Sequence, residues 1–457
     1  MAKNYTSTLA EYAAGMRWED LPAPVVSHAK RIVMDTIGCG LFGSSLPWSG
    51  ISAKVLAAME RTGKSGVWGT PRRMSSAHAT LANGSAAHSF ELDDLAAAFH
   101  TGAVTLVPAL AVAQETGHIS GRTLLTAVIA GTEVGRRVAD CVTPETVRPG
   151  FYFPALISVF AAAAAVGKIV GLSDREMVYA FSHAGSQAGG LMAVQYGGMM
   201  KRMLLGRAAQ TGVYSALLAQ AGYTGIEDIF ELGFGGFCST FTDTGKTADL
   251  STLVEGLGKK YGTLIVKFKR YSCRGPIHTS LDIIRSLRQD GHRLDPNEIQ
   301  RVTLRVPRWV KEVVGWQYVP RDIAAAQLNL TYSVAVMLLD GDAFVDQYTE
   351  EKIRSPRVLD LIRRTTVVSD PVLDGAFPQR PSIVDIVLKN GQTVSRRMER
   401  ALEFTEAEMM NKFRRLAGKV ASARRIDKIV EQVNSLDRME DVSELAETLT
   451  FGRGKGR

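Results

Sequence analysis

Cysteine is scarce in this chain, and long apolar runs are absent. The 457 residues include four cysteines, none of them in a Cys-x-x-Cys pair. In a chain of this length, such usage indicates a reducing compartment and argues against a disulfide framework or a cysteine-based zinc site. The longest apolar run, Phe160 to Val166, is too short to span a bilayer, and the N-terminal segment lacks the apolar core of a secretory signal. We therefore expect a cytoplasmic protein with no membrane partner.

Several motifs that would identify a chemistry are also missing. The sequence contains no Gly-x-Gly-x-x-Gly after a strand, no P-loop, no His-Glu-x-x-His and no Gly-x-Ser-x-Gly elbow. The glycine-rich stretch 234–237 has no strand and helix around it to cradle a phosphate. Nucleotide-binding, zinc-hydrolase and serine-hydrolase functions are therefore unsupported.

The charge balance is basic, with a net charge of +8 and an isoelectric point near 9.2. Apart from a cluster near the C-terminus, the basic residues are dispersed, and no RNA-recognition, zinc-finger or basic-zipper pattern accompanies them. Composition alone does not establish a nucleic-acid site. We expect no nucleic-acid partner, and interpret the charge as a solvated surface plus a basic pocket for a polyanionic small molecule.

The length favours two domains, and the texture of the sequence changes after about residue 260. Before that point, alanine-rich segments with helical spacing dominate. The expected helices there are 6–16, 22–38, 49–62, 77–92, 106–117, 123–139, 152–170, 173–185, 201–222 and 227–231.

Strand-like patterns appear only after about residue 260. Segments 301–306, 365–369, 383–388 and 392–398 are β-branched or alternating, and helices are expected between them at 279–290 and 324–339. Asn390-Gly391 between two strand-like runs favours a type I′ hairpin turn. The chain turns helical again at 405–416, 422–434 and 442–448, and we expect this tail to return to the helical domain.

The densest group of candidate catalytic residues lies early in the chain. Glu91, Asp93 and Asp94 lie within nine residues of His100, and carboxylates can set the charge and orientation of an imidazole for proton transfer. Taken alone, the same spacing also fits a solvated helix end with an incidental histidine.

Two further segments contain basic residues that are candidates for binding a carboxylate. Lys201 follows two glycines and two methionines, so it could be a fixed cation for a carboxylate or a lysine whose stem covers apolar surface. Lys267, Lys269 and Arg270 precede a Cys/Gly/Pro break before His278, which fits a cleft wall or a basic linker. Tyr332 lies in an apolar helical run, where a core position is the simpler interpretation.

These segments, in this order and over nearly the whole chain, resemble the MmgE/PrpD family. That family includes 2-methylcitrate dehydratases, cis-aconitate decarboxylases and iminodisuccinate epimerases. The motifs that carry the resemblance are NGSAAHSFELDD with HTGA, GHISGRTLLTAVIAGTEVGRR, PGFYFPALISVFAAAAAVGKIVGLS, KRMLLGRAAQTGVYSALLAQAGYTG, KFKRYSCRGPIHTSLDII and LNLTYSVAVMLLDG.

The resemblance implies a mainly α fold. It implies a large all-helical domain built from both chain ends, here 1–265 and 400–457, and a smaller inserted α+β lid, here 266–399. It also implies a homodimer, an active site in the interdomain cleft, and neither a metal nor an organic cofactor. The matching catalytic candidates are His100, Lys201, Lys269, Asp93 and Asp94, with Tyr152 at a further family position. Expected substrate-binding residues are Glu91, Arg270, His278 and Tyr332.

The sequence departs from the family pattern near these residues. Where the family has Asp-x-Asp-Asp, this chain has Glu91 in place of the first aspartate. Leu95 replaces the threonine that usually follows, and the loop to His100 looks shortened by about two residues. Tyr152 replaces the histidine of the family's usual Gly-Phe-His, and Leu204 replaces a histidine that occurs later in the family pattern. The threonine and the second histidine belong to the pocket in the decarboxylase branch, so their loss counts against cis-aconitate decarboxylation.

The primary hypothesis is a cofactor-independent lyase of a small di- or tricarboxylate, a dehydratase acting on a 2-methylcitrate-like hydroxy acid of propionate metabolism. Lys201 and Lys269 would hold carboxylates and stabilise developing charge, and His100 would exchange the proton. Tyr152 would act as an acid or as a hydrogen-bond donor, since a phenol's ordinary pKa of about 10 suits an acid better than a base. The alternatives are an epimerase that uses His100 and Tyr152 on opposite faces, a decarboxylase, and a carboxylate-binding protein without activity.

Overall fold

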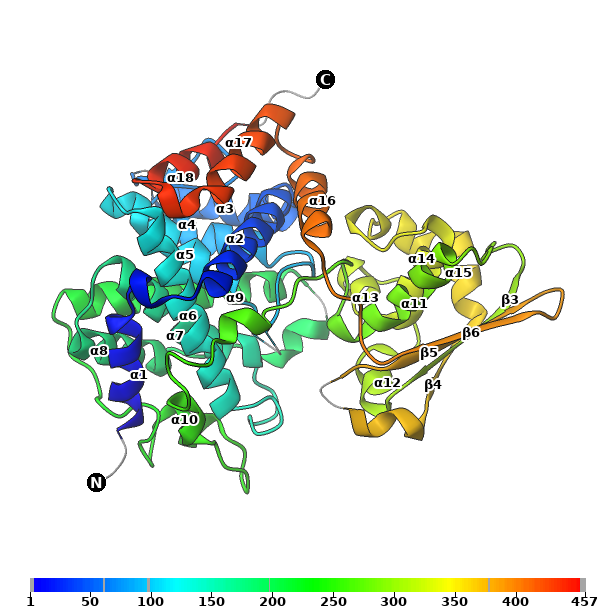
Figure 1. The fold of residues 1–457 in the computed structure, drawn as a ribbon, viewed down its shortest axis with the longest axis horizontal. Coiled ribbons are helices and arrows are strands. Elements are labelled where there is room, and N and C mark those ends of the chain that lie inside the picture. Colours follow the sequence, from blue (N-terminus) through cyan, green and yellow to red (C-terminus); the bar gives the residue numbers. More distant parts are fainter. Residues whose placement is uncertain (1–3, 61, 97–98, 197, 377–378, 453–457) are drawn as a thin grey trace.

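The computed structural model describes residues 4–452, except for residues 61, 97–98, 197 and 377–378. The chain is mainly helical, which confirms the expectation of a mainly α fold (Figure 1). Within these described residues, no helix combines the length and the apolar character needed to cross a lipid bilayer.

The larger group of elements, which we call the helical body, combines both ends of the chain. Its elements are α1 (Tyr5–Gly15), α2 (Ala23–Gly43), α3 (Pro47–Met59), β1 (Ser65–Gly66), β2 (Arg73–Met74), α4 (Ser76–Ala87), α5 (Gly102–Thr116), α6 (Gly121–Cys141), α7 (Phe153–Ile169), α8 (Asp174–Ser186), α9 (Met200–Gln220), α10 (Phe237–Phe241), α16 (Glu406–Ala417), α17 (Ala423–Asn434) and α18 (Ser443–Leu449). The alanine-rich helix α7 is at the centre, buried against α5, α6, α8 and α9, because small side chains let helix axes approach closely. The C-terminal helix α16 packs on α2.

The smaller group, the α+β part, contains a four-stranded sheet and lies to one side of the helical body (Figure 1). The strand order is β4-β3-β5-β6, with β3 parallel to β4 and antiparallel to β5. Its elements are α11 (His278–Gln289), β3 (Ile299–Val306), α12 (Arg308–Val314), α13 (Ile323–Gln327), α14 (Leu330–Asp340), α15 (Pro356–Arg363), β4 (Thr365–Ser369), β5 (Ser382–Leu388) and β6 (Thr393–Met398).

Two large apolar cores accompany these two groups. One draws its buried side chains from residues 9–268 and 409–451, and the other mainly from 271–394. The second core also takes in Phe42, Phe90 and Leu92 of the helical body, so the segment after α4 is packed between both cores. The domain boundaries expected from the sequence stay a prediction.

The structure corrects four local expectations. Helix α4 ends at Ala87 rather than at residue 92, and residues 227–231 form turns instead of a helix. The single helix expected over 324–339 is two helices, because the Asn329 side chain accepts a hydrogen bond from the Tyr332 amide and caps a new helix. The hairpin at Asn390-Gly391 exists, but Gly391 alone has a positive φ there, whereas a type I′ turn needs two such residues.

Candidate active site

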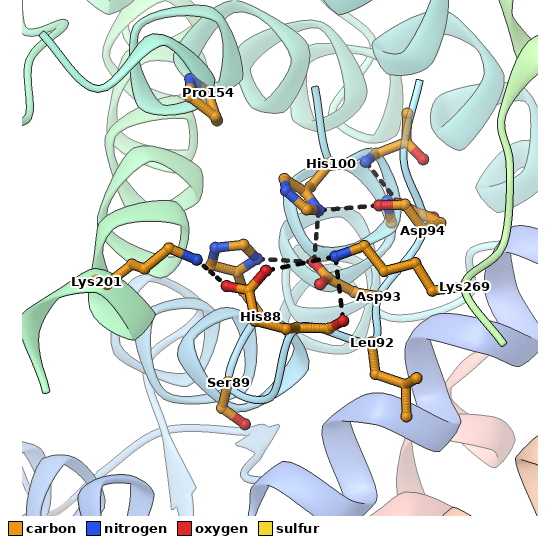
Figure 2. A network of polar contacts seen from close by, with 12 residues as sticks. His88, Ser89, Leu92, Asp93, Asp94, His100, Pro154, Lys201 and Lys269 are labelled. Atoms are coloured by element: carbon orange, nitrogen blue, oxygen red, sulfur yellow. Dashed lines mark hydrogen bonds and ion pairs between the residues drawn. The ribbon is translucent and has the colours of Figure 1, made fainter. Parts of the chain in front are cut away.

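Glu91 is at the centre of a largely buried ionic cluster. Its carboxylate contacts the ammonium of Lys201, and its other oxygen is 3.6 Å from Lys269 Nζ, which also donates to the Glu91 carbonyl at 3.1 Å. Burial opposes the charge on Glu91, but the two ammonium groups outweigh it and hold the pKa of this carboxyl well below its ordinary value. Figure 2 shows the two lysines reaching from opposite sides toward the segment that carries His88 and Asp93.

Asp93 lies beside this cluster and joins two histidines. Its Oδ2 is 2.8 Å from His88 Nδ1 and 3.1 Å from His100 Nδ1, and the two imidazole rings meet edge to face at 4.5 Å between centroids. Burial alone would raise the pKa of Asp93, yet the imidazoles keep it well below its ordinary value. One carboxylate therefore orients both rings.

The contacts of His100 determine its tautomer. Nδ1 lies 2.9 Å from the carbonyl oxygen of Asp94, and a carbonyl can only accept, so this nitrogen must carry the proton. The opposite nitrogen, Nε2, is then the basic one in the neutral ring. His100 is thus prepared to take up and release a proton at Nε2.

Tyr152 reaches the same cluster from the start of α7. Its hydroxyl is 3.5 Å from His88 Nε2. Burial lowers the pKa of His88 to about 4, so the ring is neutral at pH 7. Burial also raises the pKa of the Tyr152 phenol, with Glu91 and Asp93 adding to the effect, so the phenol stays protonated. Tyr152 can therefore donate a hydrogen bond to a neighbouring acceptor.

Asp94 has a different setting from Asp93. Its carboxylate accepts hydrogen bonds from the amides of Thr101 and Gly102, at 2.8 and 3.0 Å, where helix α5 begins. A carboxylate at a helix N-terminus is favoured by the exposed N–H groups there. Burial, together with the nearby Asp35 and Asp93, raises the pKa of Asp94 to about 7. Its side chain anchors the loop to α5, and only its carbonyl contacts His100.

Close helix packing brings the two ends of the site together. A Cβ atom on Gly84 of α4 would lie 2.9 Å from the Gly206 Cα of α9, so only glycine allows this approach. His88 follows Gly84 at the end of α4, and Lys201 precedes Gly206 in the first turn of α9. The chain leaves helix α4 after Ala87. Three residues beyond His88, Glu91 has a φ of 55°, a conformation that costs free energy for any residue other than glycine.

A buried ion pair from distant parts of the chain holds that segment. Lys412 of α16 lies 2.6 Å from Asp35 Oδ1 of α2 and donates to the Leu92 carbonyl, also at 2.6 Å. From the α+β part, Ser272 and Gln327 both donate to the Phe90 carbonyl. The backbone between His88 and Asp94 is therefore fixed from both cores, which accounts for the unfavourable φ of Glu91.

Lys412→Met is expected to destabilise the fold by about 3–5 kcal/mol, because it leaves the Asp35 carboxylate buried without its partner. Urea denaturation measures this free energy. The matched control is Lys419→Met, which breaks the half-exposed pair with Asp346 and should cost less than about 1 kcal/mol. Equal losses in the two variants would mean that the buried pair has no special structural role.

Three residues expected at the site have contacts of other kinds. Arg270 pairs with Asp282 and Glu408. The Tyr332 hydroxyl donates to the Gln347 carbonyl at 2.6 Å, inside the second core. His278 is buried near Lys269, with Nε2 3.4 Å from the Cys273 carbonyl. Within the described chain, none of the three has a hydrogen bond or ion pair to the His88–His100 cluster, so their substrate-binding roles stay predictions.

His278 should make stability depend on pH. Burial, followed by the charge of Lys269, lowers its pKa from 6.5 to about 3. The unfolded chain therefore binds a proton below pH 6.5 that the folded chain does not, and stability is lost as the pH falls toward 3. We expect His278 to account for about 2 kcal/mol of the loss between pH 7.5 and pH 5.

Urea denaturation of His278→Gln at both pH values measures this share. The variant should lose less stability on acidification than the wild type, whereas His292→Gln, at an exposed position, should behave like the wild type. An unchanged acid loss in His278→Gln would contradict the assignment.

The sequence interpretation missed His88 as a member of the cluster. His88 lies inside the NGSAAHSFELDD motif, five residues before Asp93. The expected helix over 77–92 concealed it, because on one continuous helix His88 and Asp93 would lie on different faces. The end of α4 at Ala87 is what lets the side chains meet.

His88, Asp93 and His100 could also be considered as metal ligands, since their ligand atoms lie within 4.8 Å of one another. Two imidazoles and one carboxylate are a common donor set for transition metals. The His100 nitrogen that faces Asp93 is Nδ1, however, and its contact with the Asp94 carbonyl requires a proton there. A shared hydrogen-bond network fits these contacts better than a metal centre does.

Fold and site together define a mainly helical protein in which histidines, carboxylates and lysines form one largely buried polar cluster. The chain belongs to the MmgE/PrpD family: the N-terminal domain model of that family matches residues 7–248, and the C-terminal domain model matches residues 271–436.

Characterised relatives match over nearly their whole length. The chain is 34% identical to a cis-aconitate decarboxylase-like protein, oryM, of Aspergillus oryzae, with 97% of this chain and 96% of the relative covered. It is 29% identical to a cis-aconitate decarboxylase of Aspergillus terreus, with coverage of 97% and 95%. It is 28% identical to the human cis-aconitate decarboxylase, with coverage of 98% and 95%.

Proposed function

We propose that this protein is a carboxy-lyase that removes one carboxylate, as carbon dioxide, from an unsaturated tricarboxylate of the cis-aconitate type. The observation that carries the proposal is the convergence of Lys201 and Lys269 on the largely buried carboxylate of Glu91, two residues before the Asp93 that pairs with His100. A position that holds the carboxylate of Glu91 between two ammonium groups is chemically suited to a substrate carboxylate. The relatives named above favour decarboxylation over the dehydration that the sequence first suggested.

In the proposed step, the carbon–carbon bond to the leaving carboxylate breaks and carbon dioxide departs. The electron pair remains on the substrate, where Lys201 and Lys269 stabilise the developing negative charge. His100, protonated at Nε2, delivers that proton to carbon and returns to its neutral form. Asp93 stabilises the imidazolium before transfer and keeps the ring oriented. The tricarboxylate plus one proton thus gives a dicarboxylate and carbon dioxide.

Dehydration of a 2-methylcitrate-like hydroxy acid is the second candidate. The hydroxyl of Tyr152 favours it, because it lies 3.5 Å from His88 Nε2 and can donate a hydrogen bond to a leaving hydroxyl group. The residues that would bind carboxylates are the same in both reactions. Only the bond that breaks is different.

One experiment distinguishes the reactions. The purified protein is incubated in D₂O with cis-aconitate, citrate, 2-methylcitrate or iminodisuccinate, and the products are analysed by mass spectrometry. Decarboxylation of cis-aconitate, with one deuterium in the product, is expected. Loss of water from a hydroxy acid would replace the first proposal with the second. Deuterium exchange with no other change would instead indicate an epimerase, and ligand binding without any product would refute the enzymatic proposal.

A further inference from the structure

Two arginines of the α+β part lie together without a carboxylate partner. Arg274 precedes helix α11, and Arg380 precedes strand β5. A Cβ atom on Gly275 would lie 2.5 Å from Arg380 Nη1, which places that guanidinium directly against the backbone next to Arg274. Neither arginine has an ion pair among the described residues, and no described group accepts a hydrogen bond from the buried Arg380 Nε.

The contacts that these arginines do have are weak. The guanidinium of Arg274 donates to the Val313 carbonyl at 3.4 Å, a long hydrogen bond. Burial, followed by the neighbouring charge of Arg274, lowers the pKa of Arg380. Two adjacent guanidinium groups that are partly buried repel each other, and an anion placed between them would remove that cost.

The position of the pair relates it to the candidate active site. The Arg274 amide donates to the Gln327 carbonyl at 3.0 Å, and the Gln327 side chain donates to the carbonyl of Phe90, the residue before Glu91, at 2.9 Å. The charge of Glu91 also acts on Arg274, and the charge of Arg380 acts on His278. The two arginines therefore border the Glu91 cluster on the side of the α+β part. Lys201, His88 and His100 come from the helical body.

We propose that Arg274 and Arg380 form a second carboxylate-binding subsite, which holds one of the two substrate carboxylates that do not react. This subsite rests on the proposed function and specifies its substrate class. The ligand has at least three carboxylates, one at this subsite and the others near Lys201 and Lys269. Planar guanidinium groups bind carboxylates in a forked geometry, so the subsite would also set the orientation of the substrate.

The charges of the described groups agree with such a ligand. Lys201, Lys269, Arg274 and Arg380 are cationic, whereas Glu91 and Asp93 are the carboxylates with a pKa well below the ordinary range. Arg202 adds a further buried cation, stacked 4.3 Å over the Trp48 ring and close enough to Glu91 to interact with its charge. These cations outnumber the two carboxylates, so the described groups around Glu91 carry a net positive charge that suits a polycarboxylate ligand.

Binding of unreactive probes tests the subsite without turnover. Propane-1,2,3-tricarboxylate has three carboxylates, and glutarate and succinate have two. Isothermal titration calorimetry should show that the wild type binds the tricarboxylate at least about tenfold more tightly, since a charge-assisted hydrogen bond contributes about that factor. Arg274→Gln and Arg380→Gln should each lose at least tenfold in affinity for the tricarboxylate and change less than twofold for the dicarboxylates.

Two further variants keep the test interpretable. Arg288→Gln is the matched control, because this partly buried arginine of α11 also lacks a carboxylate partner within the described chain, but donates to the carbonyls of Met337 and Leu338. It should bind all three probes like the wild type. Arg274→Lys keeps the charge and loses the fork, so it should lie between the wild type and Arg274→Gln in tricarboxylate affinity even if the glutamine variant fails to fold.

The outcomes separate the subsite from the reaction. Equal losses of affinity for all three probes, or no loss in either arginine variant, would overturn the subsite. If the wild type distinguishes the probes through Arg274 and Arg380 but never decarboxylates cis-aconitate, the subsite stands and the proposed reaction fails. If decarboxylation occurs and both arginine variants keep the wild-type KM, the subsite fails and the reaction stands.

Discussion

Replacing His100 with glutamine is expected to lower kcat on the true substrate by at least about 1,000-fold, within the range that positioned acid–base groups contribute. Glutamine can still accept and donate hydrogen bonds near Asp93, but it cannot take up and release a proton at the position of Nε2. Steady-state turnover, followed through product formation, measures the loss.

The fold of the His100→Gln variant should remain intact, with circular dichroism and melting temperature close to the wild type. His292→Gln is the matched control, because this histidine is exposed and lies in the α+β part. It should keep full activity. Turnover of His100→Gln within tenfold of the wild type would remove His100 from the proposed mechanism.

Replacing Lys201 with methionine is expected to lower kcat/KM by about 100- to 1,000-fold, the range seen when one group that stabilises developing charge is removed. Methionine keeps the apolar stem and removes the ammonium that contacts Glu91. Substrate-saturation kinetics on the true substrate measure the effect.

Lys201→Met also leaves Glu91 with Lys269 alone, so part of its effect could come from the unpaired carboxylate. The double variant Lys201→Met/Glu91→Gln removes that charge. It should recover thermal stability and remain inactive. A double variant that regains wild-type turnover would mean that Lys201 only neutralises Glu91 and has no direct role with substrate.

The sequence predicted much of the fold because its periodic patterns are strong. The alanine-rich run of α7 and the alternating run of β3 appear at the expected places. The errors are at boundaries, where tertiary contacts override local preference. Residues 88–92 continue a helical pattern, yet the chain leaves the helix because Ser272, Gln327 and Lys412 bind its carbonyl groups. No local pattern contains those partners, which come from as far as 320 positions along the chain.

At the candidate site, too, the sequence indicated which residues take part but not which of them contact one another. Its ionisable residues were visible in the sequence, and family resemblance related Lys201 and Lys269 to His100. The structure adds which groups meet: Asp93 binds two imidazoles, whereas Asp94 anchors helix α5. Two neighbouring aspartates in one motif gave no means of telling them apart, because successive side chains in a loop point in different directions.

The most direct test is the reaction of the wild type and the His100→Gln variant with cis-aconitate in D₂O, followed by mass spectrometry of the products. The wild type should release one carbon dioxide for each dicarboxylate formed and place one solvent deuterium on its carbon skeleton, and the variant should do neither at a comparable rate. Release of carbon dioxide by both proteins at equal rates, or none by the wild type, would contradict decarboxylation with His100 as the proton donor.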